Sequence, residues 1–152
     1  MQDCHNHEAC ATQAIADAEQ ACQKMDARMT PTRRRILELL WESHQPSKAY
    51  DILTRLQQEM PSAKPPTVYR ALDFLLEHGL IHRIERLNAF VGCHHPQQQG
   101  QCYFFLCKEC HNAQELHIPE LTSTLQQHLR QHALTAHQVT LEVEGICGHC
   151  TH

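Results

Sequence analysis

The chain has 152 residues, which suits one domain of ordinary size or two small ones. No apolar run is long enough for a transmembrane helix, and the first residues lack the basic and apolar regions of a secretory signal, so we expect a cytoplasmic protein without a membrane partner. Thiols stay reduced in that compartment, and nine cysteines beside fourteen histidines therefore argue for metal binding rather than disulfides.

The net charge of −4 conceals an uneven distribution of charge along the chain. Residues 28–86 contain ten Lys or Arg against seven Asp or Glu, whereas the remainder contains three against ten. A mildly basic segment between acidic ones is a weak indication of a nucleic-acid partner.

Four helices are expected in the first half of the chain, because apolar residues recur there at helical spacing. The first, residues 11–27, is rich in Ala and Gln. The second follows Thr30, a good N-cap residue, and the third follows Ser47, which we expect to cap it in the same way. The fourth begins at Pro65 and stops at Gly79.

The hydrophobic period changes after this fourth helix. The segments "LIHRIE" and "AFVGC" are short and partly alternating, with "RLN" between them, which predicts a β-hairpin. Three helices followed by a hairpin make a winged helix-turn-helix, whose last helix would be the recognition helix. We expect an N-terminal helix and winged-helix DNA-binding domain in residues 1–92, a polar hinge in residues 93–101 and a second domain in residues 102–152.

The second domain is predicted to contain three strands and one helix. "CYFFLC" and "AQELHI" are predicted strands, "PELTSTLQQHLRQHA" is a predicted helix with Pro119 at its start, and "HQVTLEVEGIC" is an alternating strand. The fold class is therefore α+β, with a winged helix-turn-helix followed by a small α/β domain.

Two CxxC pairs lie at the ends of predicted strands in this domain. Four thiolates in a tetrahedron are a common structural zinc site, and two such pairs supply them. A redox dithiol or plain buried thiols are the alternatives, but a redox CxxC usually occurs singly and before a helix. We predict a structural zinc site, worth on the order of 10 kcal/mol of folding free energy, from Cys107, Cys110, Cys147 and Cys150.

A second, less regular group of potential ligands surrounds the end of the hairpin, the hinge and the first strands of the second domain. Its members are His82, Cys93, His94, His95, Cys102, Glu115 and His117. One metal ion bound by both domains would fix their orientation. Alternatively, His82 is a surface residue on a strand, Cys93 a small buried hydrophobe and Glu115 a solvated carboxylate.

These segments together resemble a known family. The run "AKPPTVYRALDFLLEHGLIHRIE", the hinge cysteine, the paired CxxC motifs, "TPTRRRIL" and "AYDIL" resemble the ferric uptake regulator family, and within it the zinc uptake regulators. The resemblance covers residues 28–150. It implies a dimeric, metal-dependent transcription factor with a C-terminal α/β dimerisation domain. The implied function is a zinc-responsive repressor of zinc uptake genes, with no catalytic residues and no small organic substrate.

The family pattern implies structural zinc at the four cysteines and a separate regulatory site, hence about two Zn²⁺ ions per subunit. Three regulatory ligands fall on His82, Cys93 and Glu115. The chain departs from the pattern at the remaining histidine, where it has "QQQGQ". His95 is the nearest candidate and His94 the second. Cys102 is a further alternative, because related regulators carry a histidine just before the first CxxC.

The identity of the metal follows from the ligands. A thiolate among nitrogen and oxygen ligands favours zinc, whereas iron and manganese sensors favour imidazole and carboxylate. An iron-, manganese- or peroxide-sensing regulator of the same family is the first alternative. A zinc-ribbon interaction protein would need no winged helix, and a zinc enzyme needs an open metal position that closed CxxC pairs do not offer.

Double-stranded operator DNA is the expected partner of the homodimer. Arg70 can donate two hydrogen bonds to one guanine, and Tyr69 can pack on a thymine methyl or a phosphate unless it packs in the core. Further contacts with the DNA backbone are expected from Tyr50, Lys64 and Thr67. Metal would hold the winged helices at operator spacing and raise DNA affinity roughly 5–150-fold. The arginines at 33–35 form either another basic face or a solvated helix surface.

Overall fold

The computed structural model describes residues 7–94 and 101–151. The chain divides into two compact units, Met1–Gln98 and Gln99–His152. Within the described ranges, no helix has the length and apolar character needed to cross a membrane.

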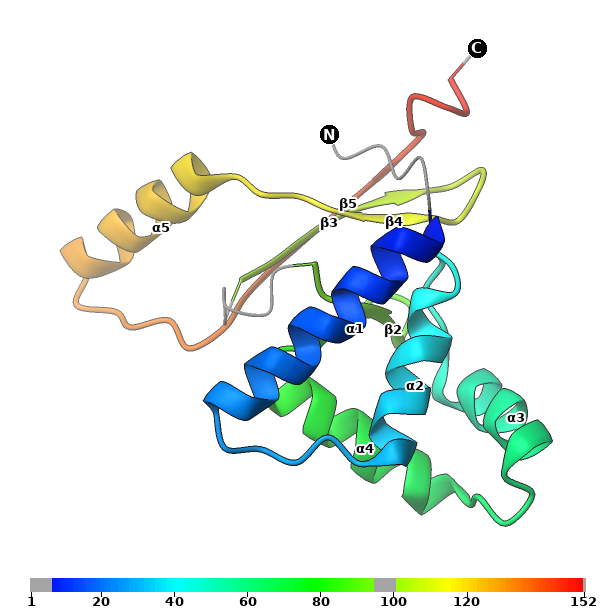
Figure 1. Cartoon of the computed structure of the whole chain (residues 1–152). Helices are drawn as coiled ribbons and strands as arrows, with labels where there is room; N and C mark the ends of the chain where they lie inside the picture. Colours follow the sequence, from blue (N-terminus) through cyan, green and yellow to red (C-terminus); the bar gives the residue numbers. More distant parts are fainter. Residues whose placement is uncertain (1–6, 95–100, 152) are drawn as a thin grey trace. The chain divides into compact units, whose positions relative to one another are not determined.

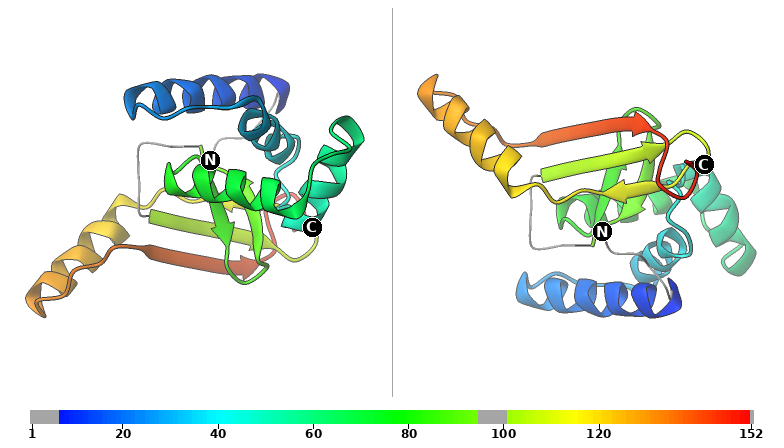
Figure 2. Two further views of the ribbon diagram at one scale, coloured as in Figure 1. Left: turned by 90° about the horizontal axis from the view of Figure 1, so that it is seen from below. Right: turned by 90° about the horizontal axis from the view of Figure 1, so that it is seen from above.

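The first unit consists of four helices and a two-stranded hairpin (Figure 1, Figure 2). The elements are α1 (His7–Lys24), α2 (Pro31–Trp41), α3 (Ala49–Glu59), α4 (Pro65–Glu77), β1 (Ile81–Ile84) and β2 (Ala89–Gly92). Helices α2, α3 and α4 with the β1–β2 hairpin form the predicted winged helix, and α1 lies against α2. The first helix begins at His7, earlier than its Ala-rich segment indicated.

One apolar core joins the four helices. Ile36 of α2, Ile52 of α3 and Leu75 of α4 are fully enclosed, and Ile15 of α1 packs into the same cluster. Full burial of one such side chain contributes ~1.5–3 kcal/mol. The helical spacing of apolar residues therefore marks the faces that meet in this core.

The predicted ends of α2 and α4 are confirmed. The Thr30 side chain accepts a hydrogen bond from the Arg33 backbone N–H at 3.3 Å, which caps α2. Helix α4 begins at Pro65. Gly79 after α4 has a positive φ of 67°, a conformation open to glycine, and its N–H donates to the Leu76 carbonyl at 3.0 Å.

The prediction that Ser47 caps α3 is wrong. The N-cap position is Lys48, which makes no side-chain capping bond. Ser47 instead pairs with Phe90 of β2: the Ser47 N–H donates to the Phe90 carbonyl at 2.9 Å, and the Phe90 N–H donates back at 2.8 Å. This pairing satisfies a backbone N–H and carbonyl of each residue, and it ties the α2–α3 connection to the wing.

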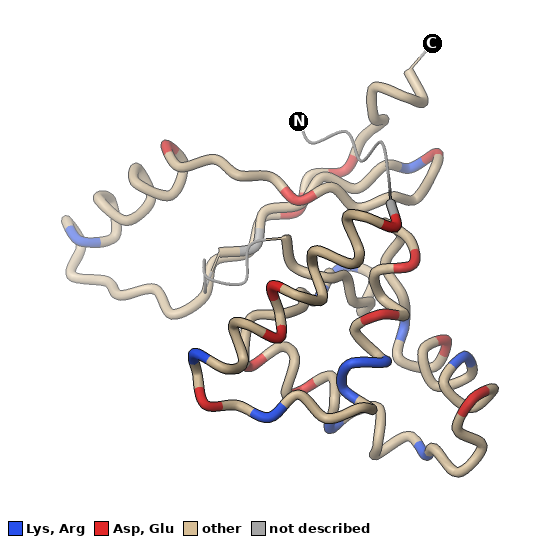
Figure 3. The backbone as a smooth tube through the Cα atoms, viewed as in Figure 1, with Lys and Arg blue, Asp and Glu red and all other residues tan. Residues whose placement is uncertain are grey.

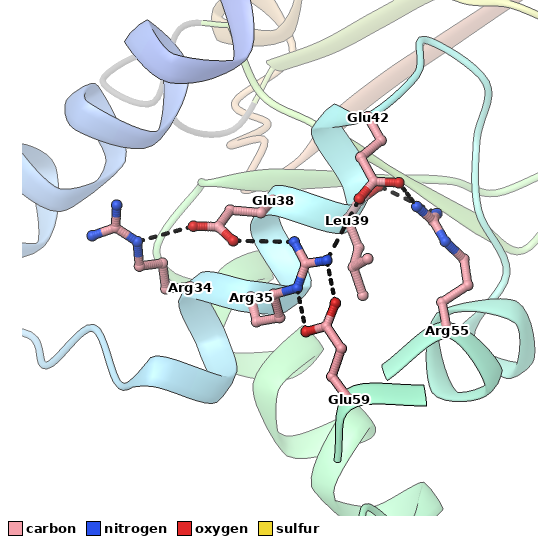
Figure 4. Close-up of polar contacts among 7 residues, drawn as sticks. All are labelled: Arg34, Arg35, Glu38, Leu39, Glu42, Arg55 and Glu59. Carbon is pink, nitrogen blue, oxygen red and sulfur yellow. Dashed lines mark hydrogen bonds and ion pairs between the residues drawn. The ribbon is translucent and has the colours of Figure 1, made fainter. Parts of the chain in front are cut away.

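Two of the consecutive arginines on α2 form ion pairs with other helices, and Figure 4 shows the pair of Arg35 with Glu59. The Glu59 carboxylate at the end of α3 binds Arg35 at two points, with Nε 2.7 Å from Oε2 and Nη2 2.5 Å from Oε1. Arg34 pairs with Glu19 of α1 and with Glu38 of its own helix. These pairs connect α1 and α3 to α2, although exposed ion pairs contribute little stability one by one.

Arg33, the third of these arginines, and Arg55 of α3 also make contacts between helices of the winged helix. The Arg33 guanidinium carbon lies 3.7 Å from the centre of the Phe74 ring on α4. Arg55 of α3 pairs with Glu42, directly after α2 (Figure 4). The arginines at 33–35 therefore act between helices, which matches neither a free basic face nor a plain solvated surface.

The second unit is a three-stranded sheet with one helix (Figure 1). Its elements are β3 (Gln101–Cys107), β4 (Ala113–Glu115), α5 (Pro119–Gln131) and β5 (Val139–Gly145). The strand order is β4-β3-β5, with β3 antiparallel to β4 and parallel to β5. No residue of α5 is buried, and its Thr122 hydroxyl lies 3.0 Å from the Tyr103 hydroxyl of β3.

The two units differ in charge. Lys and Arg are concentrated in the first unit, and the second carries only Lys108 and Arg130 (Figure 3). The mildly basic sequence segment thus coincides with the winged helix.

Replacing Gly92 by Ala is expected to destabilise the first unit. A Cβ atom there would lie 2.3 Å from Cε2 and Nε1 of Trp41, and the indole is only 3% exposed. Overpacking of this kind costs ~1–3 kcal/mol. Urea unfolding followed by helical circular dichroism should show a lower midpoint for Gly92→Ala.

The same substitution should also be measured in the Trp41→Phe variant. The smaller phenylalanine ring lacks the indole atoms that the new methyl group would contact. Gly92→Ala should cost less free energy of unfolding in that background than in the natural chain. Equal costs in both backgrounds would contradict the close contact.

Candidate metal centres and nucleic-acid interface

The four cysteines of the CxxC pairs meet at one edge of the second sheet. Strand β3 ends at Cys107 and β5 at Gly145, and these residues are paired in the parallel register. The turn after β3 carries Cys110, and the turn after β5 carries Cys147 and Cys150. Adjacent parallel strands end at the same edge of a sheet, so segments distant in sequence are brought together there.

The sulfur atoms have the spacing of a tetrahedral metal shell. All four Sγ atoms lie within 4.8 Å of one another, and those of Cys110 and Cys147 are 3.8 Å apart. Zn–S bonds of about 2.3 Å in a tetrahedron require sulfur atoms roughly 3.8 Å apart. Cys107 is buried and the other three cysteines are half-buried, so the group is largely closed. The residues present therefore fit zinc.

Hydrogen bonds within the group shift two thiol pKa values in opposite directions. Backbone N–H groups of Cys110 and Cys147 lower the pKa of the Cys107 thiol to about 6; the Cys147 N–H donates to this sulfur at 3.4 Å. The hydrogen bond with the Cys147 side chain, followed by burial, raises the pKa of the Cys150 thiol to about 12. The thiolate form of Cys107 is therefore favoured at neutral pH, and a bound cation would displace the proton of Cys150.

In the first unit, an imidazole and a thiol lie together beside the hairpin. His82 is on β1, opposite Val91, and is 8% exposed. Cys93 directly follows β2, is 4% exposed, and its N–H donates to the Leu80 carbonyl at 3.0 Å. Their potential ligand atoms lie within 4.8 Å of each other. The alternative that His82 is a surface residue is therefore wrong.

The other predicted ligands have different outcomes. Glu115 is the last residue of β4 in the second unit and is half-buried, whereas His117 is exposed. His95 and the side chain of Cys102 lie outside the described residues. Only residues 93, 94 and 101 of the predicted hinge fall within the described ranges.

His94 packs against an aromatic side chain of the winged helix. Its ring meets Trp41 edge-on, with 4.8 Å between ring centres, and stacks with His44 at 6.3 Å. Sequence reasoning did not single out His44, because it comes from a loop that only the fold brings near the end of β2. His94 thus has a packing role within the first unit.

The predicted DNA-contacting residues lie at the starts of α3 and α4. Tyr50 is 76% and Tyr69 55% exposed, so the alternative that Tyr69 packs in the core is wrong. Lys64 is the N-cap residue of α4, and Thr67 donates its backbone N–H to the Lys64 carbonyl at 2.9 Å. Arg70 is exposed one turn into the helix. These side chains offer donors and aromatic surface beside a helix N-terminus, which suits phosphate and base-edge contacts.

The first unit has the winged-helix fold found in many DNA-binding proteins, and the second groups four thiols at the spacing of a metal site. The model of the ferric uptake regulator family matches residues 24–144, and the chain belongs to this family. The family comprises transcription regulators, so the protein is a regulator rather than an enzyme.

Three comparisons give its relationships within the family. The chain is 34% identical over 137 residues to the zinc uptake regulation protein of Escherichia coli (strain K12), covering 90% of this chain and 80% of that protein. It resembles the structure of a zinc uptake regulator complexed with zinc and DNA, with 33% identity, a TM-score of 0.84 and coverage of 92% and 94%. It also resembles the crystal structure of holo XcZur, with 39% identity, a TM-score of 0.82 and coverage of 90% and 95%.

Replacing Cys147 by Ser is expected to unfold the second unit. The change removes one of the four clustered thiols, and structural zinc contributes on the order of 10 kcal/mol to the folding of small metal-bound domains. We expect loss of tightly held zinc, measured by elemental analysis, together with loss of amide protection in strands β3 and β5.

The matched control is His149→Ala, which alters an exposed residue between Cys147 and Cys150 but leaves every thiol in place. It should retain zinc and amide protection. If Cys147→Ser kept both as well, the four-thiol site would be refuted.

Proposed function

We propose that the protein is a zinc-responsive transcriptional repressor that binds operator DNA as a dimer and controls zinc uptake genes. The observation that carries this proposal is the buried pair of His82 and Cys93 beside the wing. A buried thiol next to an imidazole suits a borderline-soft ion such as Zn²⁺ better than Fe²⁺ or Mn²⁺. The similarity to zinc uptake regulators supports the same choice of metal.

The proposal includes two zinc ions of different kinds in each subunit. The four clustered cysteines of the second unit would hold one permanently, because a closed thiolate shell leaves no position for exchange with water. The second ion would bind His82 and Cys93 and be released when zinc is scarce. Treatment with a mild chelator should therefore remove one zinc ion and leave the other.

We propose that Glu115 and His95 complete the regulatory site. Glu115 belongs to the second unit, so an ion held by His82, Cys93 and Glu115 would connect the two units. His95 is preferred to His94 because the His94 ring is packed against Trp41. A thiolate, two imidazoles and a carboxylate make a shell of four, which Zn²⁺ accepts.

The regulatory ion would act by restricting orientation. Without it, two winged helices in a dimer seldom match the spacing of two operator half-sites. With it, the correct arrangement exists before DNA arrives, so affinity rises without any new contact to DNA. Thermodynamic linkage then requires DNA to tighten zinc binding by the same factor.

On the DNA, helix α4 would enter the major groove. Arg70 would read guanine and Tyr69 a thymine methyl or phosphate, while Lys64 and the N-terminus of α4 bind phosphate. Tyr50 at the start of α3 would contact the neighbouring DNA backbone.

Cys93→Ser is expected to abolish the zinc dependence of DNA binding while the fold persists. A hydroxyl is a poor zinc ligand compared with a thiolate, so the regulatory ion would be lost. DNA affinity with added zinc should fall roughly 5–150-fold, towards that of the chelator-treated natural protein. Fluorescence anisotropy with a duplex selected by the zinc-loaded protein measures this change.

Cys10→Ser on α1 is the control, because it makes the same chemical change at a half-buried cysteine that is not among the proposed ligands. It should respond to zinc like the natural protein. Full zinc dependence in Cys93→Ser would refute the regulatory site, whereas iron or manganese restoring DNA binding to the natural protein better than zinc would favour the alternative sensors.

Arg70→Ala is expected to weaken operator binding by ~1–3 kcal/mol and to relax the preference for guanine at one position of each half-site. Binding to a panel of duplexes with single base changes measures both effects. Lys64→Ala should instead weaken binding to all duplexes alike and lower the slope of log affinity against log salt by about one.

Arg34→Ala is the matched control for charge, because it removes an arginine that is paired with Glu19 and Glu38 and is not among the proposed DNA contacts. It should leave base preference and the salt slope unchanged. A loss of guanine preference in Arg34→Ala but not in Arg70→Ala would contradict the proposed orientation of α4.

A further inference from the structure

Helix α5 carries two histidines that the proposed function does not use. His128 lies in its last turn and His132 is its C-cap residue. The two rings have centres 4.9 Å apart and planes inclined by 55°, and both side chains are exposed. No residue of α5 is buried, so neither ring is held in place by a core.

The spacing of these histidines suits a shared metal ion. Residues four apart lie on the same face of a helix, one turn above the other. The same four-residue spacing lets two histidines of one helix bind a single zinc ion in metalloproteases. Rings this close need only small side-chain rotations to bring one nitrogen from each to about 2.0–2.1 Å from one ion.

The charges along this segment agree with a cation at this end of the helix. The last carbonyl groups of a helix carry partial negative charge, which stabilises a cation near its C-terminus. Arg130 lies between the histidines in sequence but about 200° around the helix from each, since each residue advances the helix by roughly 100°.

The ligand chemistry narrows the class of ion. Residues 121–141 contain no Asp or Glu, so this stretch of chain offers imidazole and no carboxylate. Imidazole suits zinc, copper and nickel, whereas magnesium and calcium need oxygen ligands.

We propose that His128 and His132 form a surface site for one late first-row transition metal ion, completed by water. It is separate from the thiol group: Thr122 joins the start of α5 to Tyr103 near the beginning of β3, whereas the thiols lie where β3 and β5 end. With only two protein ligands, the site binds more weakly than four thiolates and fills only when free metal is abundant. The bound ion links the last turn of α5 to its C-cap residue and stabilises that end of the helix.

The test uses the full chain loaded with zinc, titrated with Ni²⁺ in the absence of DNA. The informative variant exchanges two neighbouring residues, Gln127→His with His128→Gln. Composition is unchanged, but the histidines are then five apart and on different faces. Calorimetry should show a Ni²⁺ site that binds about tenfold or more weakly in the exchanged variant than in the natural chain. Ni²⁺ should also broaden amide signals around residues 128–132 only in the natural chain.

Residues 1–10 contain two Cys and two His that could also bind Ni²⁺. Equal Ni²⁺ stoichiometry and affinity in both proteins would overturn the proposal, as would broadening confined to this N-terminal segment. That segment is identical in the two proteins, so its own metal binding cancels in the comparison. Unchanged zinc content and circular dichroism would show that the variant is folded. Because no DNA is present, the result does not depend on the proposed repressor function.

Discussion

The parallel pairing of β3 with β5 is the constraint on which the second unit depends. It brings the ends of two strands to the same edge of the sheet, and each strand continues into a CxxC turn. The hydrogen bond from Lys108 N–H to the Gly145 carbonyl extends the pairing to the first of these turns. This unit has few buried side chains and a helix with none, so its sheet gains little from apolar burial. Ligation of the four sulfur atoms by one metal ion would supply the missing free energy.

The first unit has an extensive apolar core, in contrast to the second. Its helices and hairpin must in addition keep a fixed geometry to bind DNA. The apolar faces of four helices provide the stability. Orientation comes from polar contacts that cross between elements: Arg35 with Glu59, Arg34 with Glu19, and the backbone pairing of Ser47 with Phe90. That pairing also joins the wing to the helices, so a metal ion bound at His82 on the wing would act on the whole recognition module.

The sequence predicted the structure correctly where a local pattern of residues is compatible with only one kind of element or site. Helical periodicity with Thr30 and Gly79 at the ends predicted α2 and α4 closely, and the paired CxxC motifs predicted the thiol group. The prediction that Ser47 caps α3 was wrong because the N-cap position falls on residue 48. The backbone of Ser47 pairs with Phe90, and a contact so distant in sequence cannot be predicted from the local pattern. The same limit hid the partners of the arginines on α2 and the contact of His94 with Trp41, which only the folded chain determines.

The ion pairs made by arginines within the winged helix affect how strongly the protein binds DNA of any sequence. Arg34, Arg35 and Arg55 are engaged by carboxylates, and the chain as a whole carries a net charge of −4. These ion pairs compete with phosphates for three of the basic side chains of the winged helix, which lowers non-specific affinity, because that affinity comes almost entirely from phosphate contacts. When non-specific affinity is low, a coupling free energy of only ~1–3 kcal/mol between zinc binding and DNA binding is enough to determine whether the operator is occupied. The internal arginine pairs and the proposed zinc control thus support each other: the first limits indiscriminate binding, and the second decides when specific binding occurs.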